Sequence, residues 1–384
     1  MRFDAKFTAL IDRFSSDSSL PIALAVSGGS DSIALLNVCV DWARRTRRTL
    51  IVYTVDHQLR RESRGEAEHV GAMCQAWQIP HQILTWKRPK ATQNAARLAR
   101  YQLLAEAMNA VGAKVLLTGH TRDDVVETAI IRRRRGVRDA NVAGPSLAAP
   151  LPIWPSGRGL TLLRPLICTR RAELRESLRA QDIDWVEDPS NLNQSFERVR
   201  IREFLRHHPK LHELAITAVT RMQTERTVLD QSVADALRRV TVHPDGLIDT
   251  ADAPRSVRLL TILARIASGA AKDSRAHSVS ALKTSLTKPG ARQTLGGSWF
   301  QRNGTGFLIG RDPGAPPSDG DRDVFDGRFL IDPKASLPEP ASASFLVRHA
   351  LPPDSEWREI ISDRLDHMCA CLQTKPLQLT GERA

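Results

Sequence analysis

The sequence predicts an α/β protein: a doubly wound parallel sheet, followed by a helical domain and a small mixed C-terminal domain. In the first half of the chain, short apolar runs alternate with longer segments whose apolar residues recur at helical spacing. The short runs predict four strands, at residues 22–26, 50–55, 81–86 and 114–118. Alternation of helices with largely apolar strands is typical of a parallel sheet covered by helices on both faces.

The segments between these strands predict helices. One helix begins near Ile33, with Leu36 and Val40 on the same face, and two more cover residues 66–77 and 94–111. Each helix would carry the chain back across the sheet, which is the connection that parallel strands require.

Polar clusters follow three of the predicted strands, at residues 27–32, 56–62 and 119–127. In open parallel sheets, ligands bind beyond the carboxyl ends of the strands. We therefore expect the three clusters to converge in one crevice, which makes this edge of the sheet the candidate site.

The pattern changes after about residue 205. A break at His207 to Pro209 precedes a long amphipathic helical segment, residues 211–240, and two shorter ones follow at 255–268 and 276–287. From Thr294 onwards, glycine-punctuated strands and turns dominate. Because a single core stops growing near ~250–300 residues, the 384 residues predict several domains. The expected divisions are 1–205, 206–290 and 291–384.

The amino-acid composition limits which classes of protein this chain can belong to. The chain has 55 Lys and Arg against 43 Asp and Glu, a net charge of +12, which favours polyanionic partners such as nucleic acid. Five scattered cysteines favour reduced thiols and a cytoplasmic protein. The sequence contains no 18-residue apolar run and no apolar N-terminal stretch, so neither a membrane-spanning helix nor a signal peptide is expected.

A glycine- and serine-rich loop lies between the first predicted strand and the helix after it. The loop consists of Ser27, Gly28, Gly29, Ser30, Asp31 and Ser32. Glycines let the backbone approach an anion, and free amides at a helix N-terminus point towards it. Asp31 would repel a bare phosphate, which suggests a Mg²⁺ ion between the carboxylate and the phosphates. The alternative is a serine-capped turn without a ligand.

This loop resembles the signature of the N-type ATP pyrophosphatases, the PP-loop superfamily, which split ATP between its α- and β-phosphates. Further motifs over the first half of the chain resemble the tRNA(Ile)-lysidine synthase family. They are Val55–Arg60, Thr118–Thr128, Arg164–Leu166, Trp185–Asn191 and the series Arg198, Arg200 and Arg202. Thr294–Gly297 and Asp326–Phe329 are weaker similarities.

The resemblance implies a ligase that uses ATP and Mg²⁺. The wobble cytidine of an isoleucine tRNA with the anticodon CAU would be adenylated at its C2 oxygen, and free L-lysine would then displace AMP to form lysidine. The tRNA would thereafter read AUA instead of AUG. A tRNA-thiolating enzyme of the same superfamily is one alternative, although the sequence lacks the Cys-x-x-Cys pairs that its cluster would need. A non-catalytic tRNA-binding protein is another, and a homodimer is one assembly that the sequence leaves open.

Three acidic residues are the candidates for binding the lysine ammonium. Asp123, Asp124 and Glu127 are three and four positions apart, so they can share one helical face. Asp124 and Glu127, with Asp31 and His120, form the predicted catalytic set. Acidic residues in a first helical turn also favour the helix dipole, so simple capping is the alternative for the acids. For His120 the alternative is a structural hydrogen bond.

Two groups of arginines are candidates for contacts with tRNA. Arg198 and Arg202 lie four residues apart and would form a basic ridge on one helix, which suits phosphate binding. Arg132 and Arg133 open a run of four arginines where the family tends to keep apolar residues, so they would either grip tRNA or mark a frayed helix end. Thr121 also departs from the family, which often has a second histidine there.

Overall fold

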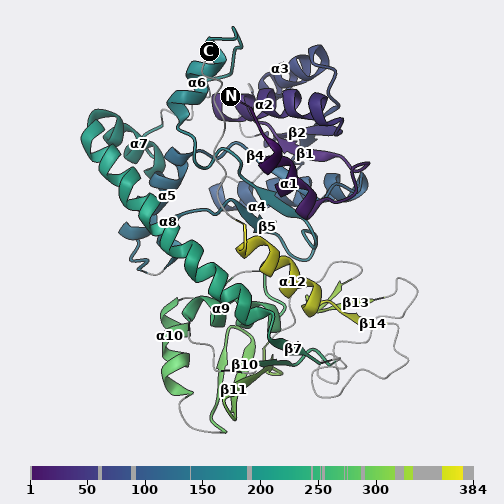
Figure 1. Ribbon diagram of the computed structural model, residues 1–384, viewed down its shortest axis with the longest axis vertical. Coiled ribbons are helices and arrows are strands. Elements are labelled where there is room, and N and C mark those ends of the chain that lie inside the picture. The colour runs from purple at the N-terminus through teal and green to yellow at the C-terminus, as the bar shows by residue number, and fades with distance from the viewer. Residues whose placement is uncertain are drawn as a thin grey trace. The chain divides into compact units, whose positions relative to one another are not determined.

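The computed structural model (Figure 1) describes thirteen stretches of the chain. They are 2–58, 63–87, 92–138, 140–187, 193–243, 245–250, 252, 256–271, 273–274, 276–286, 290–315, 324–331 and 357–374.

By its internal contacts the chain forms two compact units: residues 1–151, 160–227 and 374–384 make the first, and 152–159 with 228–373 make the second. The expected boundaries at 205 and 290 stay a prediction. None of the described helices is both long and apolar enough to cross a membrane.

A mostly parallel sheet organises the first unit, as predicted. Its strands are β1 (Ile22–Ala25), β2 (Leu50–Asp56), β3 (His81–Thr85), β4 (Val115–Thr118), β5 (Ala148–Pro150) and β6 (Thr161–Leu163). They lie in the order β3-β2-β1-β4-β6-β5, and every neighbouring pair is parallel except β5 and β6. The antiparallel edge strand β5 and its neighbour β6 were not predicted, because three residues are too short to show a period.

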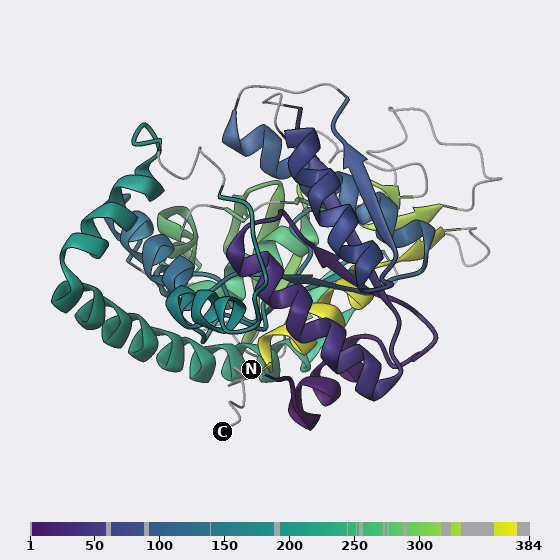
Figure 2. The ribbon, with the colours of Figure 1, turned by 90° about the horizontal axis from the view of Figure 1, so that it is seen from above.

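Helices connect these strands, precede the first of them and follow the last (Figure 1). They are α1 (Ala5–Phe14), α2 (Ser30–Thr46), α3 (Ser63–Ala76), α4 (Gln93–Ala110), α5 (Arg122–Arg134), the 3₁₀ turn η1 (Ala140–Ala143), α6 (Arg171–Arg179), α7 (Glu197–His207) and α8 (Pro209–Leu237). α7 and α8 meet at a corner, which Figure 2 shows clearly. Pro209 begins α8, where its missing N–H costs nothing and its fixed φ suits a helix.

The strand order determines where ligands can bind. From β1 the chain builds β2 and β3 on one side, and then returns to place β4 on the other side, where Ala23 pairs with Leu116. β6 follows β4 in the same direction, with Val115 paired to Thr161. The order therefore reverses between β1 and β4, which is the position where doubly wound sheets bind nucleotides. The segments after β1, β4 and β6 all emerge at this edge.

The second unit combines helices with two antiparallel sheets. Its elements include β7 (Val240–Val242), β8 (Ile248–Thr250), α9 (Val257–Ala267), α10 (Ala276–Ser285), β9 (Arg292–Leu295), β10 (Ser298–Asn303), β11 (Gly306–Arg311), β12 (Val324–Phe325), β13 (Phe329–Ile331), β14 (Trp357–Glu359) and α12 (Ile361–Leu372). One sheet has the order β7-β8-β11-β10-β9 and the other β12-β13-β14.

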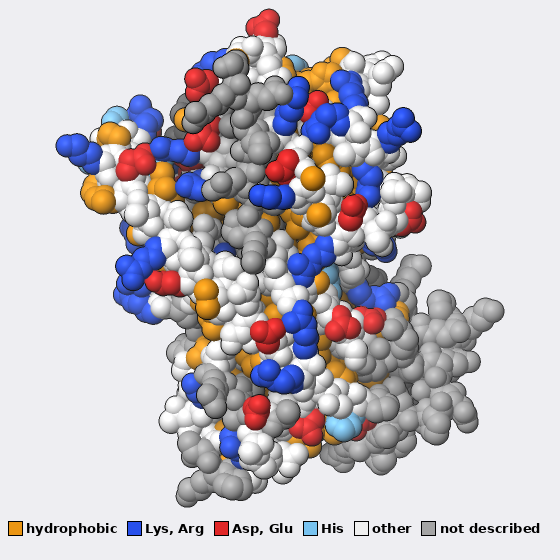
Figure 3. Space-filling model, in the orientation of Figure 1, with side chains coloured by type: hydrophobic (Ala, Val, Ile, Leu, Met, Phe, Trp, Pro, Cys, Tyr) orange, Lys and Arg blue, Asp and Glu red, His pale blue; other side chains and the backbone are white. Residues whose placement is uncertain are grey.

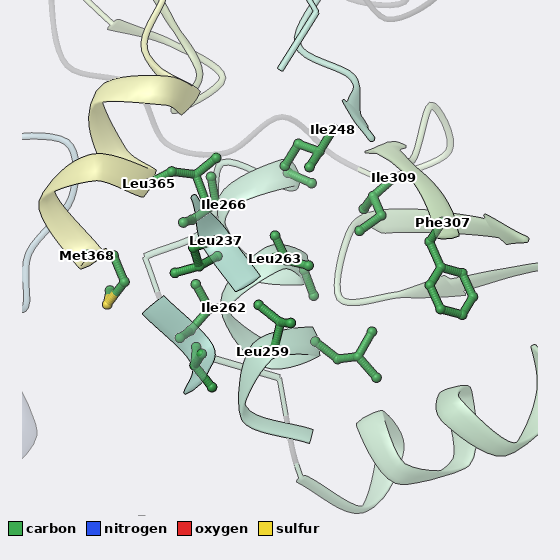
Figure 4. Packing of buried hydrophobic residues seen from close by; sticks show 14 of the residues in the cluster. Leu237, Ile248, Leu259, Ile262, Leu263, Ile266, Phe307, Ile309, Leu365 and Met368 are labelled. Carbon is green, nitrogen blue, oxygen red and sulfur yellow. The ribbon is translucent and has the colours of Figure 1, made fainter. Parts of the chain in front are cut away.

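One apolar core holds these elements together. Leu263 of α9 is fully buried, and around it Figure 4 shows Leu237 from the end of α8, Ile309 from β11 and Leu365 from α12. Leu282 of α10 belongs to the same cluster. The helical segments before residue 290 and the strands after it therefore share a core.

Candidate active site

The glycine- and serine-rich loop joins β1 to the first turn of α2, as predicted. Gly28 has a φ of 88°, a left-handed conformation that favours glycine. The side chain of Ser32 closes the loop: its hydroxyl accepts from the Ser27 amide at 3.2 Å and donates to the Gly29 carbonyl at 2.9 Å. In the described part of the chain, the amides from Gly28 to Asp31 donate no hydrogen bond. Four backbone donors at a helix N-terminus are thus available for an anion.

The segment after β4 lies directly against this loop. Gly119 has so little room that a Cβ atom added there would be 2.7 Å from the carbonyl oxygen of Asp31. Glycine therefore allows the start of α5 to approach the loop closely, and the predicted meeting of clusters 27–32 and 119–127 is confirmed. The third cluster is only partly described, since residues 59–62, with Leu59 and Arg60 of the family motif, lie outside the described residues. Asp188 to Asn191 lie outside them as well.

Asp124 completes the capping box at the start of α5 and also faces the loop. Its Oδ2 atom accepts from the amide and the hydroxyl of Thr121, at 2.8 and 2.9 Å, and Thr121 in turn accepts from the amide of Asp124. Thr121, where the family often has histidine, is thus the fully buried N-cap of α5. The capping interpretation of Asp124 is confirmed, and it leaves Oδ1 available for another partner.

That partner is Arg171, the first residue of α6, which sequence reasoning missed. Its Nε donates to Oδ2 of Asp31 at 2.8 Å, and its Nη2 donates to Oδ1 of Asp124 at 3.1 Å. Its Nη1 contacts Oε1 of Glu127 at 3.3 Å, and its backbone amide donates to Asp123 at 2.8 Å. One guanidinium, 14% exposed, therefore joins the carboxylate of the loop to those of α5.

Two further arginines, both from α7, contact Glu127. Its Oε1 lies 2.8 Å from Nε of Arg202, and its Oε2 lies 3.2 Å from Nε of Arg198. The side chain of Glu127 is 2% exposed, whereas those of Arg198 and Arg202 are 44% and 33% exposed. The predicted basic ridge, Arg198 and Arg202, thus contacts Glu127 with one side of each guanidinium and leaves the other side partly exposed to solvent.

Burial and charge act in opposite directions on these groups. Burial raises the pKa of Asp31, although Arg171 partly offsets the effect. Burial would also raise the pKa of Asp124, but Arg171, together with the amide of Thr121, lowers it overall. Asp124 is therefore a carboxylate at neutral pH. The pKa of Arg171 is raised, because Asp124, Asp31 and Glu127 outweigh its burial.

His120 follows β4 and lies among cationic groups. Its Nδ1 is 2.9 Å from the Thr118 hydroxyl. Burial, and then the charge of Arg164, lower the pKa of His120 well below its usual value, so the imidazole is neutral at pH 7. His120 therefore makes the structural hydrogen bond that was its alternative interpretation, and its contact with a ligand stays a prediction. Arg100, on α4, stacks on Tyr101 at 5.1 Å and belongs to the same cationic surroundings.

The arginine run ends α5 and has local partners. The guanidinium of Arg132 donates to the carbonyl of Asn141, and Arg135 pairs with Glu197 at 2.7 Å. Arg133 is exposed. The helix extends to Arg134 and Arg135 is its C-cap, so the run marks the helix end; whether it grips tRNA or frays stays a prediction. Figure 3 shows many other Lys and Arg side chains on the face that it presents, in keeping with the net charge.

Comparison with known proteins agrees with this geometry. Residues 1–208 match the model of a family described as PP-loop domain. The chain is 37% identical over 302 residues to a tRNA(Ile)-lysidine synthase from Hyphomonas neptunium, covering 77% of this chain and 82% of that protein. Proteins of the same name from Brucella anthropi and Mesorhizobium japonicum are each 39% identical, over 60% and 64% of this chain. The matches span only 49% and 57% of those two relatives.

Proposed function

Since this chain belongs to the tRNA(Ile)-lysidine synthases and carries their PP-loop domain, we propose that it converts the wobble cytidine of an isoleucine tRNA into lysidine. The tRNA would carry the anticodon CAU, the amine would come from free lysine, and ATP would supply the energy, releasing AMP and pyrophosphate. The reaction would take place in the cytoplasm. The observation that carries the proposal is the link between the phosphate loop and the acids of α5, made by Asp31, Arg171 and Asp124.

The loop suits the first half-reaction. The C2 oxygen of cytidine attacks the α-phosphorus of ATP, and the bond to the β-phosphate breaks. Negative charge then grows on the pyrophosphate, where the free amides from Gly28 to Asp31 can donate to it. The N-terminus of α2 adds a favourable dipole, and the hydroxyls of Ser27 and Ser30, which contact Ser32 and Asp31 within the loop, would donate to the phosphates if they turned outwards.

The same loop fits a Mg²⁺ ion through Asp31. Among the described residues, no group of three or more potential metal ligands gathers. Mg²⁺ nevertheless needs only one or two protein carboxylates when phosphate oxygens and waters complete its shell. The carboxylate of Asp31, one-fifth exposed beside the free amides, meets that need. The cation would neutralise charge on the departing pyrophosphate.

The acids of α5 suit the second half-reaction. The lysine ammonium first gives up a proton, and the resulting ε-amine attacks C2. The bond from C2 to the adenylated oxygen breaks, and AMP leaves with that oxygen. Asp124 and Glu127 would bind the lysine ammonium and orient it, with Asp123 nearby. Because the pKa of Asp124 is lowered, this carboxylate anchors the ammonium better than it accepts a proton.

Exposed and half-buried arginines would hold the tRNA while its cytidine reaches this site. The outer edges of Arg198 and Arg202 suit backbone phosphates, and Arg132 and Arg133 at the end of α5 would extend the contact. A base that reacts must leave its stack, as other base-modifying enzymes require. Because Arg198 and Arg202 also contact Glu127, a phosphate bound to them would change the electrostatic environment of the amine site.

One incubation tests the proposal. The full chain is mixed with ¹⁴C-lysine, ATP, Mg²⁺ and total bacterial tRNA, and labelled RNA is then identified by sequencing. We expect label in the isoleucine tRNA with the anticodon CAU, with AMP and pyrophosphate released in equal amounts. A thiolating enzyme would incorporate no lysine, and a non-catalytic binder would retain tRNA without releasing pyrophosphate. Either result would exclude the proposed reaction.

A further inference from the structure

We propose that Arg171 couples the nucleotide site to the lysine site: its guanidinium occupies Asp124 and Glu127 until Mg²⁺ and ATP engage Asp31, and the lysine ammonium then takes its place. The inference rests on the proposed function, because it takes the acids of α5 as the amine site. Its consequence is that each of the two substrates strengthens the binding of the other.

The contacts of Arg171 are divided between the two sites. Its shortest side-chain contact, 2.8 Å, is to Asp31 of the loop, whereas the contacts to Asp124 and Glu127 of α5 are 3.1 and 3.3 Å. The backbone of Arg171 is fixed separately, through its amide and Asp123. The guanidinium can therefore change partners without moving the start of α6.

Arg171 and a lysine ammonium would compete for the same oxygens. Asp124 already uses Oδ2 to cap α5, so Oδ1, which Arg171 contacts, is its remaining oxygen. Glu127 is shared by Arg171, Arg198 and Arg202. An ammonium that entered while Arg171 stayed would add a fourth cation around these two carboxylates, which like-charge repulsion opposes.

Mg²⁺ and ATP would remove Arg171 from this position. Asp31 would hold a divalent ion in place of its ion pair with Nε of Arg171, the shortest of the three contacts. The nucleotide also offers new partners, because phosphate oxygens accept two parallel hydrogen bonds from a guanidinium. Arg171 would thus turn from the carboxylates to the phosphates. Because binding free energies are linked, lysine must favour nucleotide binding by the same factor.

Equilibrium binding without tRNA tests the coupling apart from activity. The dissociation constant of ¹⁴C-lysine is measured by equilibrium dialysis on the full chain, with Mg²⁺ present, and with or without an ATP analogue that cannot be cleaved between the α- and β-phosphates. For the wild-type chain we expect lysine to bind about tenfold more tightly with the analogue, within the usual range of coupling. For Arg171→Gln we expect a ratio near one, with lysine bound at least as tightly as by the nucleotide-free wild type.

Two other variants complete the design. Arg171→Lys keeps one charge, but a compact ammonium lacks the planar fork of donors with which the guanidinium spans the three carboxylates, so the ratio should fall between those of wild type and Arg171→Gln. Arg179→Gln is the matched control: it lies on the same helix, is exposed and stacks on Trp185. It should keep the wild-type ratio. If Arg171→Gln proves unfolded by circular dichroism, the Arg171→Lys result decides.

The outcomes separate this inference from the proposed function. A wild-type chain that binds no lysine under either condition would contradict the proposed function itself. Lysine binding of equal strength with and without the analogue would overturn only the coupling. An unchanged ratio in both Arg171 variants would assign the coupling to other residues, and would overturn the role of Arg171.

Discussion

The Nε atom of Arg171 lies 2.8 Å from Oδ2 of Asp31, although 140 residues separate them in the chain. The contact joins the start of α6 to the start of α2, because β6 and β1 both flank β4 and all three strands run in the same direction. A parallel sheet thus gathers at one edge a phosphate loop, an acidic helix start and the arginine between them. Five experiments test the account, apart from the coupling test.

Replacing Gly119 by alanine should damage the phosphate loop. The added methyl group would meet the backbone of Asp31 at 2.7 Å, so the loop or the start of α5 must shift. We expect pyrophosphate release to fall by about 100-fold, in line with the effect of misplacing reactive groups by about 1 Å. The matched control is Gly65→Ala on α3, where an added Cβ has no neighbour within 4 Å. Normal release by Gly119→Ala would show that the close approach is unimportant.

Replacing Glu127 by glutamine should affect the KM for lysine and the KM for ATP differently. The amide keeps the size of the side chain but loses the charge, so the KM for lysine should rise at least tenfold while the KM for ATP changes much less. Initial-rate assays with each substrate varied in turn measure both constants. Glu68→Gln, an exposed partner of Arg64 on α3, is the control. Equal changes in the two KM values would exclude Glu127 from the amine site.

Removing the hydroxyl of Thr121 should destabilise the first unit. The Thr121→Val variant keeps the shape of the side chain but leaves α5 without its N-cap and Asp124 without two of its hydrogen bonds. We expect the free energy of unfolding to drop by about 1–2 kcal/mol, the usual cost of losing an N-cap. Urea titrations compare it with Thr121→Ser, which keeps the hydroxyl and should lose less. Equal losses in both variants would argue against capping as the role of this residue.

Lowering the pH should decrease the free energy of unfolding because His120 is buried as a neutral imidazole. Because burial lowers its pKa in the folded chain, the unfolded chain binds the proton more readily, and stability falls as the pH drops below the ordinary value near ~6.5. One such group contributes at most about 1.4 kcal/mol per pH unit. Unfolding free energies between pH 7 and pH 5 should therefore change less steeply in His120→Gln than in wild type. The exposed His69→Gln is the control, and an unaltered slope in His120→Gln would contradict the assignment.

Sequence reasoning located the loop and the helix of the acids because each carries its own local signal. Ser27 to Ser32 combines glycines with a helix start, and Asp124 with Glu127 follows a strand at helical spacing. The same rule, applied to one more strand, would have found Arg171. The strand before it, Thr161–Leu163, has only three residues, too few to reveal a period in the sequence.

The partners of the α7 arginines could not be predicted in the same way. Four-residue spacing puts Arg198 and Arg202 on one face of a helix, but it does not say what that face meets. Only the packing of α7 against α5 brings both arginines to Glu127. The positive charge of these two arginines therefore pairs with Glu127 as well as facing solvent. The salt dependence of tRNA binding would measure how many phosphates they contact.

The central claim is that the segment from Ser27 to Ser32 holds the pyrophosphate of ATP beside the acids of α5. Pyrophosphate release, measured with isoleucine tRNA, lysine and ATP, tests it most directly when Ser27→Ala and Asp31→Ala are compared with the wild-type chain and tRNA binding is measured in parallel. The account predicts that both variants lose pyrophosphate release and still bind tRNA. Near-normal release by both would contradict it.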